Sequence, residues 1–225
     1  MKTKIIVRII RIIIYLFLIF IAANTTRNYF IITSIEEKVK PYKDITNVHY
    51  AVSTDRIENV EYSEVYIKDN ESKTIMTNKD NSGKTTKMIQ IITKEERRNY
   101  VEADGKKTVK IYKEDNGVGI RPYFDNYLPW NEKLKNCLFG IITEEKMDGK
   151  EYYVLNGFTT YYLYDQNAVG SKIYVNKETG IREKMIEKIK VDGQIKEYTM
   201  TYKYEFNKVT DKDLEMPDLS GYEIQ

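Results

Sequence analysis

The chain has 225 residues with 20 tyrosines and only 4 prolines, a composition that excludes a disordered tail. Four of its 36 basic residues precede the first apolar run, which leaves 32 basic against 34 acidic residues beyond that run. This near balance gives no reason to expect nucleic-acid binding. Cys137 is the only cysteine, so an intramolecular disulfide is excluded.

The first predicted element is an apolar segment over residues 5–23, which carries no charge from Ile12 to Ala23. The four basic residues before that uncharged run are Lys2, Lys4, Arg8 and Arg11. Only Arg27 follows it closely. Because cationic groups resist transfer across a bilayer, we expect a single-pass protein of the cell membrane with a cytoplasmic N-terminus and an extracytoplasmic remainder.

Two fates of this segment stay open. As a retained anchor it reaches the roughly 20 residues that a span requires only if Arg8 and Arg11 extend to the headgroups. As a signal peptide it would be cut after Ala23, and the protein would be secreted. The box Ile21–Asn24 resembles a lipoprotein cleavage site without its cysteine, so lipidation there is excluded. We expect a signal anchor or signal peptide over 1–26, a connecting helix over 27–45 and one extracytoplasmic domain over 46–225.

After Pro41, which we expect to end the helix, the apolar pattern changes from a helical period to a period of two. The clearest alternation runs from Lys196 to Phe206. One face of that predicted strand carries Tyr198, Met200, Tyr202, Tyr204 and Phe206. These five residues are candidate contacts for a protein partner or a lipid, with a place in an ordinary core as the alternative.

Asp-Gly pairs lie between successive predicted strands, as expected of tight hairpins. The pairs are Asp104-Gly105, Asp148-Gly149 and Asp192-Gly193. We predict strands over 46–55, 60–68, 73–77, 87–93, 98–103 and 108–113, and then over 140–147, 151–155, 172–176, 182–191 and 195–206. Residues 118–137 interrupt the pattern and predict a loop and a short helix. The fold class is therefore mainly β with a few helices: one curved antiparallel sheet, its aromatic face covered by the first helix and this insert, or left as an apolar pocket.

Few residues in the chain suggest chemistry. His49 is the only histidine and lies on the polar face of its predicted strand, and Cys137 is expected to be a buried, inert thiol. We therefore expect no enzyme, no cofactor and no metal. Trp130 follows Pro129 and is a candidate contact for a partner, with a core position as the alternative.

Three segments in the last third carry a family resemblance: Ile173–Gly180, Tyr204–Asp211 and Met216–Tyr222. Their order resembles the LolA/LppX/RseB-like superfamily, and within it the clostridial spore-germination lipoproteins of the GerS type. The resemblance covers residues 47–222 in architecture and 173–222 in motif. It implies a half-barrel closed by helices, without catalytic machinery, that carries acyl chains in its cavity or binds a protein partner on its sheet.

Two departures from that family bear on function. The lipidated cysteine is absent, and tyrosines replace much of the aliphatic lining expected of a lipid carrier. We therefore expect a membrane-anchored module that holds a cell-envelope protein, which by the resemblance is an amidase of the spore cortex. A lipid or lipoprotein carrier is the alternative.

Overall fold

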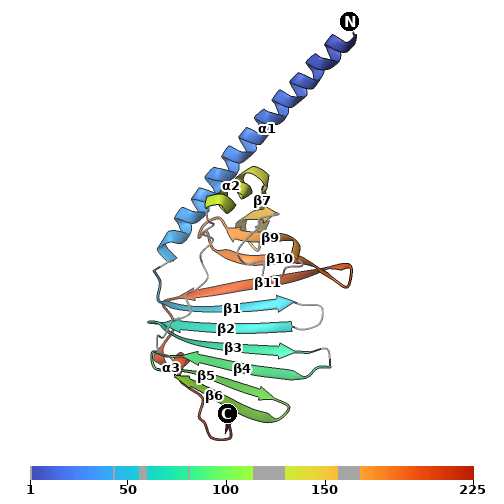
Figure 1. Ribbon diagram of the computed structural model, residues 1–225. Coiled ribbons are helices and arrows are strands. Elements are labelled where there is room, and N and C mark those ends of the chain that lie inside the picture. Colours follow the sequence, from blue (N-terminus) through green and yellow to red (C-terminus); the bar gives the residue numbers. More distant parts are fainter. Residues whose placement is uncertain (1, 43, 56–59, 81, 114–129, 157–167) are drawn as a thin grey trace.

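The computed structural model describes all residues except 1, 43, 56–59, 81, 114–129 and 157–167 (Figure 1). Helix α1 (Lys2–Val39) is one continuous rod that projects from an end of the sheet, and the 3-10 turn η1 (Lys40–Tyr42) follows it. The helix thus ends just before Pro41, as predicted. By length and composition, α1 is the single described helix that could cross a membrane. The boundary expected at residue 26 lies inside this helix.

The described strands form one sheet, whose order is β12-β6-β5-β4-β3-β2-β1-β11-β10-β9-β8-β7. The first half comprises β1 (Asn47–Asp55), β2 (Val60–Lys68), β3 (Glu71–Lys79), β4 (Thr85–Ile92), β5 (Glu96–Ala103) and β6 (Lys106–Lys113). The second half comprises β7 (Ile141–Met147), β8 (Lys150–Asn156), β9 (Ala168–Asn176), β10 (Arg182–Val191) and β11 (Gln194–Phe206). All of these strands pair antiparallel. The predicted fold class, a single open, curved antiparallel sheet with few helices, is confirmed (Figure 1).

Each predicted Asp-Gly turn is a two-residue hairpin with both central residues at positive φ. Asp148 and Gly149, for example, have φ of 50° and 80° between β7 and β8. Asp69 and Asn70 form the same turn between β2 and β3, with φ of 51° and 74°. This backbone twist matches that of the flanking strands, which explains why the hairpins could be found from sequence.

The C-terminal segment contains two elements that the sequence did not predict, helix α3 (Asp211–Leu214) and strand β12 (Glu223–Ile224), which pairs parallel with β6. Between them, Met216, Leu219 and Tyr222 pack over a buried cluster of β4, β5 and β6. That cluster consists of Ile89, Ile91, Tyr100 and Val109. Both elements are too short to show an apolar period, so only the tertiary contacts reveal them.

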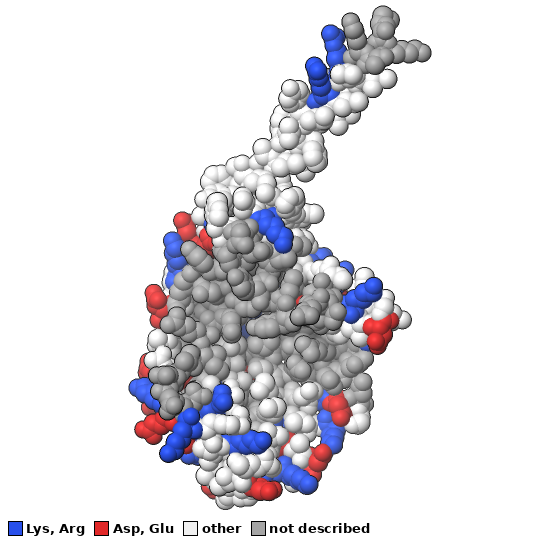
Figure 2. Space-filling view, viewed as in Figure 1, with Lys and Arg blue, Asp and Glu red and all other residues white. Residues whose placement is uncertain are grey.

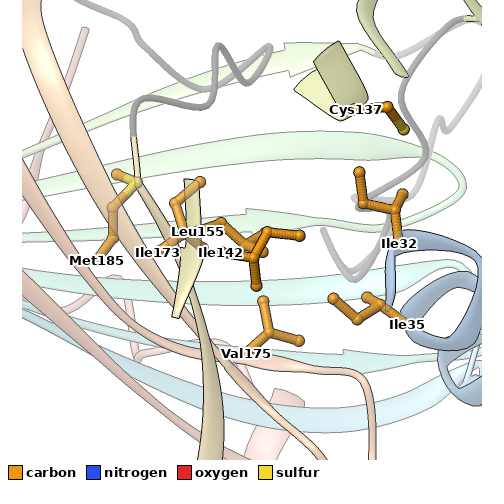
Figure 3. Close-up of a cluster of buried hydrophobic side chains, with 8 residues drawn as sticks. All are labelled: Ile32, Ile35, Cys137, Ile142, Leu155, Ile173, Val175 and Met185. Atoms are coloured by element: carbon orange, nitrogen blue, oxygen red, sulfur yellow. The ribbon is translucent and has the colours of Figure 1, made fainter. Parts of the chain in front are cut away.

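Helix α1 covers the second half of the sheet. Its residues Ile32 and Ile35 join Cys137 of helix α2 (Trp130–Phe139) in one buried cluster with strands β7 to β10 (Figure 3). The strand residues of this cluster are Ile142, Leu155, Ile173, Val175 and Met185. The expectation that the first helix and the insert cover the sheet is confirmed for α1 and α2, while residues 118–129 of the insert lie outside the described ranges.

Polar contacts fix α2 to α1. The fully buried Asn28 of α1 donates from Nδ2 to the carbonyl oxygens of Cys137 at 3.1 Å and Gly140 at 2.8 Å, in the last turn of α2 and just after it. Lys133 of α2 forms an ion pair of 2.6 Å with Glu36 of α1, and both side chains are largely buried. The two helices are therefore joined by specific contacts as well as by apolar packing.

Candidate binding surface

Strand β11 presents the five candidate residues found from sequence on one face of the sheet. We call this set, from Tyr198 to Phe206 in steps of two, the β11 face. Its register places Met200 opposite Met185 of β10 and Tyr204 opposite Tyr50 of β1. All five side chains are partly buried. The alternation thus identified residues that do share a face, and their role as contacts stays a prediction.

The aromatic rings of the β11 face form a ladder. The rings of Tyr202 and Tyr204 lie 6.3 Å apart at 4°, and those of Tyr204 and Phe206 lie 6.3 Å apart at 8°. Tyr50 extends the ladder onto β1, with its ring 5.9 Å from that of Tyr204. At the other end, the ring of Tyr42 lies 4.8 Å from that of Phe206. Met200 and Tyr202 pack against the cluster that contains Ile32 and Ile35, and Tyr204 and Phe206 pack against a second cluster that contains Val39. Four of the five residues of the β11 face therefore adjoin the core below α1, and Tyr198 lies at the end away from it.

A cation lies in this aromatic face. Arg182 of β10 is buried, and its guanidinium carbon lies 4.5 Å from the centre of the Tyr202 ring. Simple alternation would place Arg182 and Lys184 on the same side, but the pairing of β9 with β10 shifts register between them. Lys184 accordingly lies over the ring of Tyr174. Tyr174 belongs to a separate cluster with Tyr152 and Val154. The sequence gives no signal for this bulge, so Arg182 could not be assigned to the site in advance.

The phenol of Tyr204 is held in its neutral form. Burial raises the pKa of Tyr204 above its ordinary value, although the positive charge of Arg182 opposes this shift. Neutral phenols can both donate and accept hydrogen bonds. Rings, hydroxyl groups and a guanidinium together make a surface suited to mixed polar and aromatic contacts, unlike a lining of aliphatic side chains.

The other candidate, Trp130, lies apart from the β11 face at the start of α2. Its side chain is 68% exposed, so the alternative of a core position is wrong. It lines a groove of ≈ 230 Å³ between α1 and α2. The remaining lining residues are Thr25, Thr26, Tyr29, Phe30, Lys133, Leu134 and Cys137. The residues singled out from sequence therefore fall on two different surfaces.

Neither His49 nor Cys137 forms part of a reactive arrangement in the described residues. His49 stacks on Tyr66 at 4.4 Å, and its Nδ1 lies 3.2 Å from Glu205. Burial raises the pKa of the Cys137 thiol, which disfavours the reactive thiolate. Among the described residues, no group of three or more His, Cys, Asp or Glu side chains is placed to hold a metal ion.

No family model matches the sequence, and no curated protein matches it. Among solved structures, the chain is similar to LprF from Mycobacterium bovis, with 10% identity over 80% of this chain and 93% of that one, at a TM-score of 0.46. It is similar to MucB with 11% identity over 82% of this chain and a TM-score of 0.39, and it spans only 62% of the length of MucB. It is also similar to the LolA superfamily protein NE2245 from Nitrosomonas europaea, with 16% identity over 82% of this chain and 97% of that one, at a TM-score of 0.27. These likenesses concern the arrangement of the fold and carry no statement about activity.

Proposed function

We propose that this chain is a non-enzymatic, membrane-anchored binding module that holds a protein of the cell envelope against the β11 face. Helix α1 is its anchor through residues 5–23, and the sheet is its extracytoplasmic binding domain. By the resemblance of its last third to the GerS type, the partner is an amidase that acts on the spore cortex.

The observation that carries this proposal is the composition of the β11 face. Stacked tyrosines with a guanidinium against Tyr202 offer both apolar area and hydrogen-bonding groups. Tyrosine and arginine are enriched where proteins contact one another, because each combines a large contact area with a polar end.

The rigid packing of α1 against the sheet supports a module that stays anchored to the membrane. Ile32 and Ile35 of the same helix are buried against β7 to β10, so the sheet cannot swing freely about the membrane segment. A domain held in this way cannot readily shuttle cargo across a gap, which makes a diffusible carrier the second candidate. Because part of the β11 face is apolar, the carrier function is tested directly against the protein-binding function.

Site-specific photocrosslinking in cells that make the full chain tests the proposal. A photoreactive phenylalanine at Tyr198, at the end of the β11 face away from the core, should give one discrete protein adduct. The matched control is the same residue at Ile195, which lies on the opposite face of β11 and is exposed. Lipid adducts at Tyr198, identified by mass spectrometry, would replace the proposal with the carrier function. Equal adducts at both positions would exclude the β11 face as the specific contact.

A further inference from the structure

Apolar side chains are exposed where α1 enters the domain. We call these residues, Phe30 of α1, Trp130, Leu134, Leu138 and Phe139 of α2, and Ile141 of β7, the membrane-proximal patch. Trp130 is 68% exposed, Phe139 79% and Ile141 63%. In Figure 2 the lower part of the projecting α1 is uncharged down to the domain, where basic and acidic side chains begin. Large apolar side chains that gather on a surface mark a contact with a protein or a membrane.

Helix α2 carries an apolar stripe that is exposed. Trp130, Leu134 and Leu138 follow one another at intervals of four residues, so they form a stripe along one side. All three side chains are exposed, while the neighbouring Cys137 is buried against α1. Trp130, Leu134 and Cys137 line the groove between the two helices. The stripe is thus only partly used in packing the fold.

The position of the patch along α1 identifies what covers it. The helix rises about 1.5 Å per residue, so Thr25 and Tyr29 lie roughly 3 and 9 Å beyond Ala23, the end of the apolar run. The headgroup region on each side of a bilayer is roughly 5–8 Å thick. Trp130 lines the same groove as Thr25 and Tyr29, and Asn28 binds the end of α2, so both ends of α2 lie beside this part of α1.

We propose that the membrane-proximal patch enters the interface of the extracytoplasmic leaflet, so that α2 is a second membrane contact beside α1. This inference rests on the anchoring of α1 in the proposed function. Tryptophan and other aromatic side chains favour the level of the headgroups, where an apolar ring and a polar group are both accommodated. The contact holds the β7 edge of the sheet toward the membrane and directs the opposite edge, with β12 and β6, away from it.

The chain contains a single tryptophan, so its fluorescence reports on Trp130 alone. The full chain is reconstituted into phosphatidylcholine–phosphatidylglycerol vesicles and floated on a density gradient. Trp130 should emit at shorter wavelength than in the denatured chain, lose emission to lipids brominated near the headgroup more than to lipids brominated near the chain end, and be protected from aqueous acrylamide.

The matched control moves the tryptophan to the other end of the sheet. In the double variant Trp130→Phe/Ile224→Trp, the new side chain replaces an exposed residue of β12. It should be quenched by acrylamide and not by brominated lipids. In Leu134→Asn, which makes the stripe more polar, lipid quenching of Trp130 should fall while the protein still floats.

The outcomes separate the two proposals. If the chain floats but Trp130 is quenched in the same way as the tryptophan at position 224, the anchor is supported and the second membrane contact is refuted. The membrane-proximal patch would then be a contact for a protein. If the chain does not float, the anchor is refuted and the second contact with it. Lipid quenching that is equal at both positions would also overturn the inference, since it would show no preferred face.

Discussion

The carbonyl oxygen of Ile35 in α1 lies so close to Gly180, in the turn between β9 and β10, that a Cβ at Gly180 would stand 2.6 Å from it. Gly180 has φ of +72°, and the same added carbon would lie 3.1 Å from the backbone nitrogen of Val39. The Lys38 ammonium group also donates to the carbonyl oxygen of Lys177 in this turn. The end of α1 therefore packs directly against the backbone of the turn, which fixes α1 relative to the sheet.

We expect Gly180→Ala to destabilise the chain by about 2–4 kcal/mol, because it adds a backbone clash to the strain of a left-handed residue. The measurement is the free energy of unfolding of the full chain in detergent, from denaturant titration. Gly149→Ala is the matched control, since Gly149 has φ of +80° with nothing within 4 Å of an added Cβ. It should cost only about 1–2 kcal/mol. Equal losses would contradict a close contact between α1 and the turn.

This contact illustrates which features the sequence could predict. Alternation along β11 and the φ requirement of Asp148-Gly149 depend on neighbouring residues only. For this reason β1 to β11 and the Asp-Gly hairpins could be predicted, whereas β12 could not. The approach of Ile35 to Gly180 joins distant segments through packing, for which the sequence carries no period. The same holds for Arg182, whose side was changed by a bulge, and for the exposure of Trp130.

The ion pair between Lys133 and Glu36 is expected to hold α2 in place. Its side chains are only 12% and 13% exposed, so Glu36→Gln would leave a poorly solvated ammonium group without its counter-charge. We expect a loss of about 3 kcal/mol in the free energy of unfolding. Glu197→Gln removes the exposed partner of Lys188 and should change stability by less than about 0.5 kcal/mol. If the two variants unfold at the same denaturant concentration, the pair does not stabilise the helix contact.

Glu183 should make stability depend on acidic pH. Burial acts to raise the pKa of its carboxyl, but hydrogen bonds from Tyr152, Lys150 and Asn176 outweigh burial and hold the pKa below its ordinary value of 4.5. The stabilisation by Glu183 is therefore complete above pH 4.5 and is lost as the pH falls through the lower pKa of the folded state.

The free energy of unfolding of the full chain, measured from pH 6 down to pH 3, tests this dependence. Glu183→Gln should show a shallower decline than the parent chain, because the variant has no carboxyl to protonate at this position. Tyr152→Phe, which removes one of the three donors, should lie between them. A parent and a Glu183→Gln variant with parallel pH profiles would exclude Glu183 as a source of the acid sensitivity.

The C-terminal segment should be essential for the stability of the half of the sheet that contains β4 to β6. The Tyr222 ring meets that of Tyr100 edge to face at 5.2 Å, and its hydroxyl group donates to the carboxylate of Glu102. Burial, together with this hydrogen bond, raises the pKa of Tyr222 to about 12, so the phenol remains a donor at neutral pH. Tyr222→Ala should cost about 2–3 kcal/mol, because it removes both the ring contact and the hydrogen bond.

Hydrogen exchange of the full chain locates the effect of that substitution. Amides of β4 to β6 should exchange faster in Tyr222→Ala, while those of β8 to β10, which are covered by α1, keep their protection. Ile224→Ala, at an exposed side chain two residues further on, should leave both regions unchanged. Faster exchange over the whole sheet in Tyr222→Ala would instead mean that the two halves unfold as one cooperative unit, each dependent on the cover of the other.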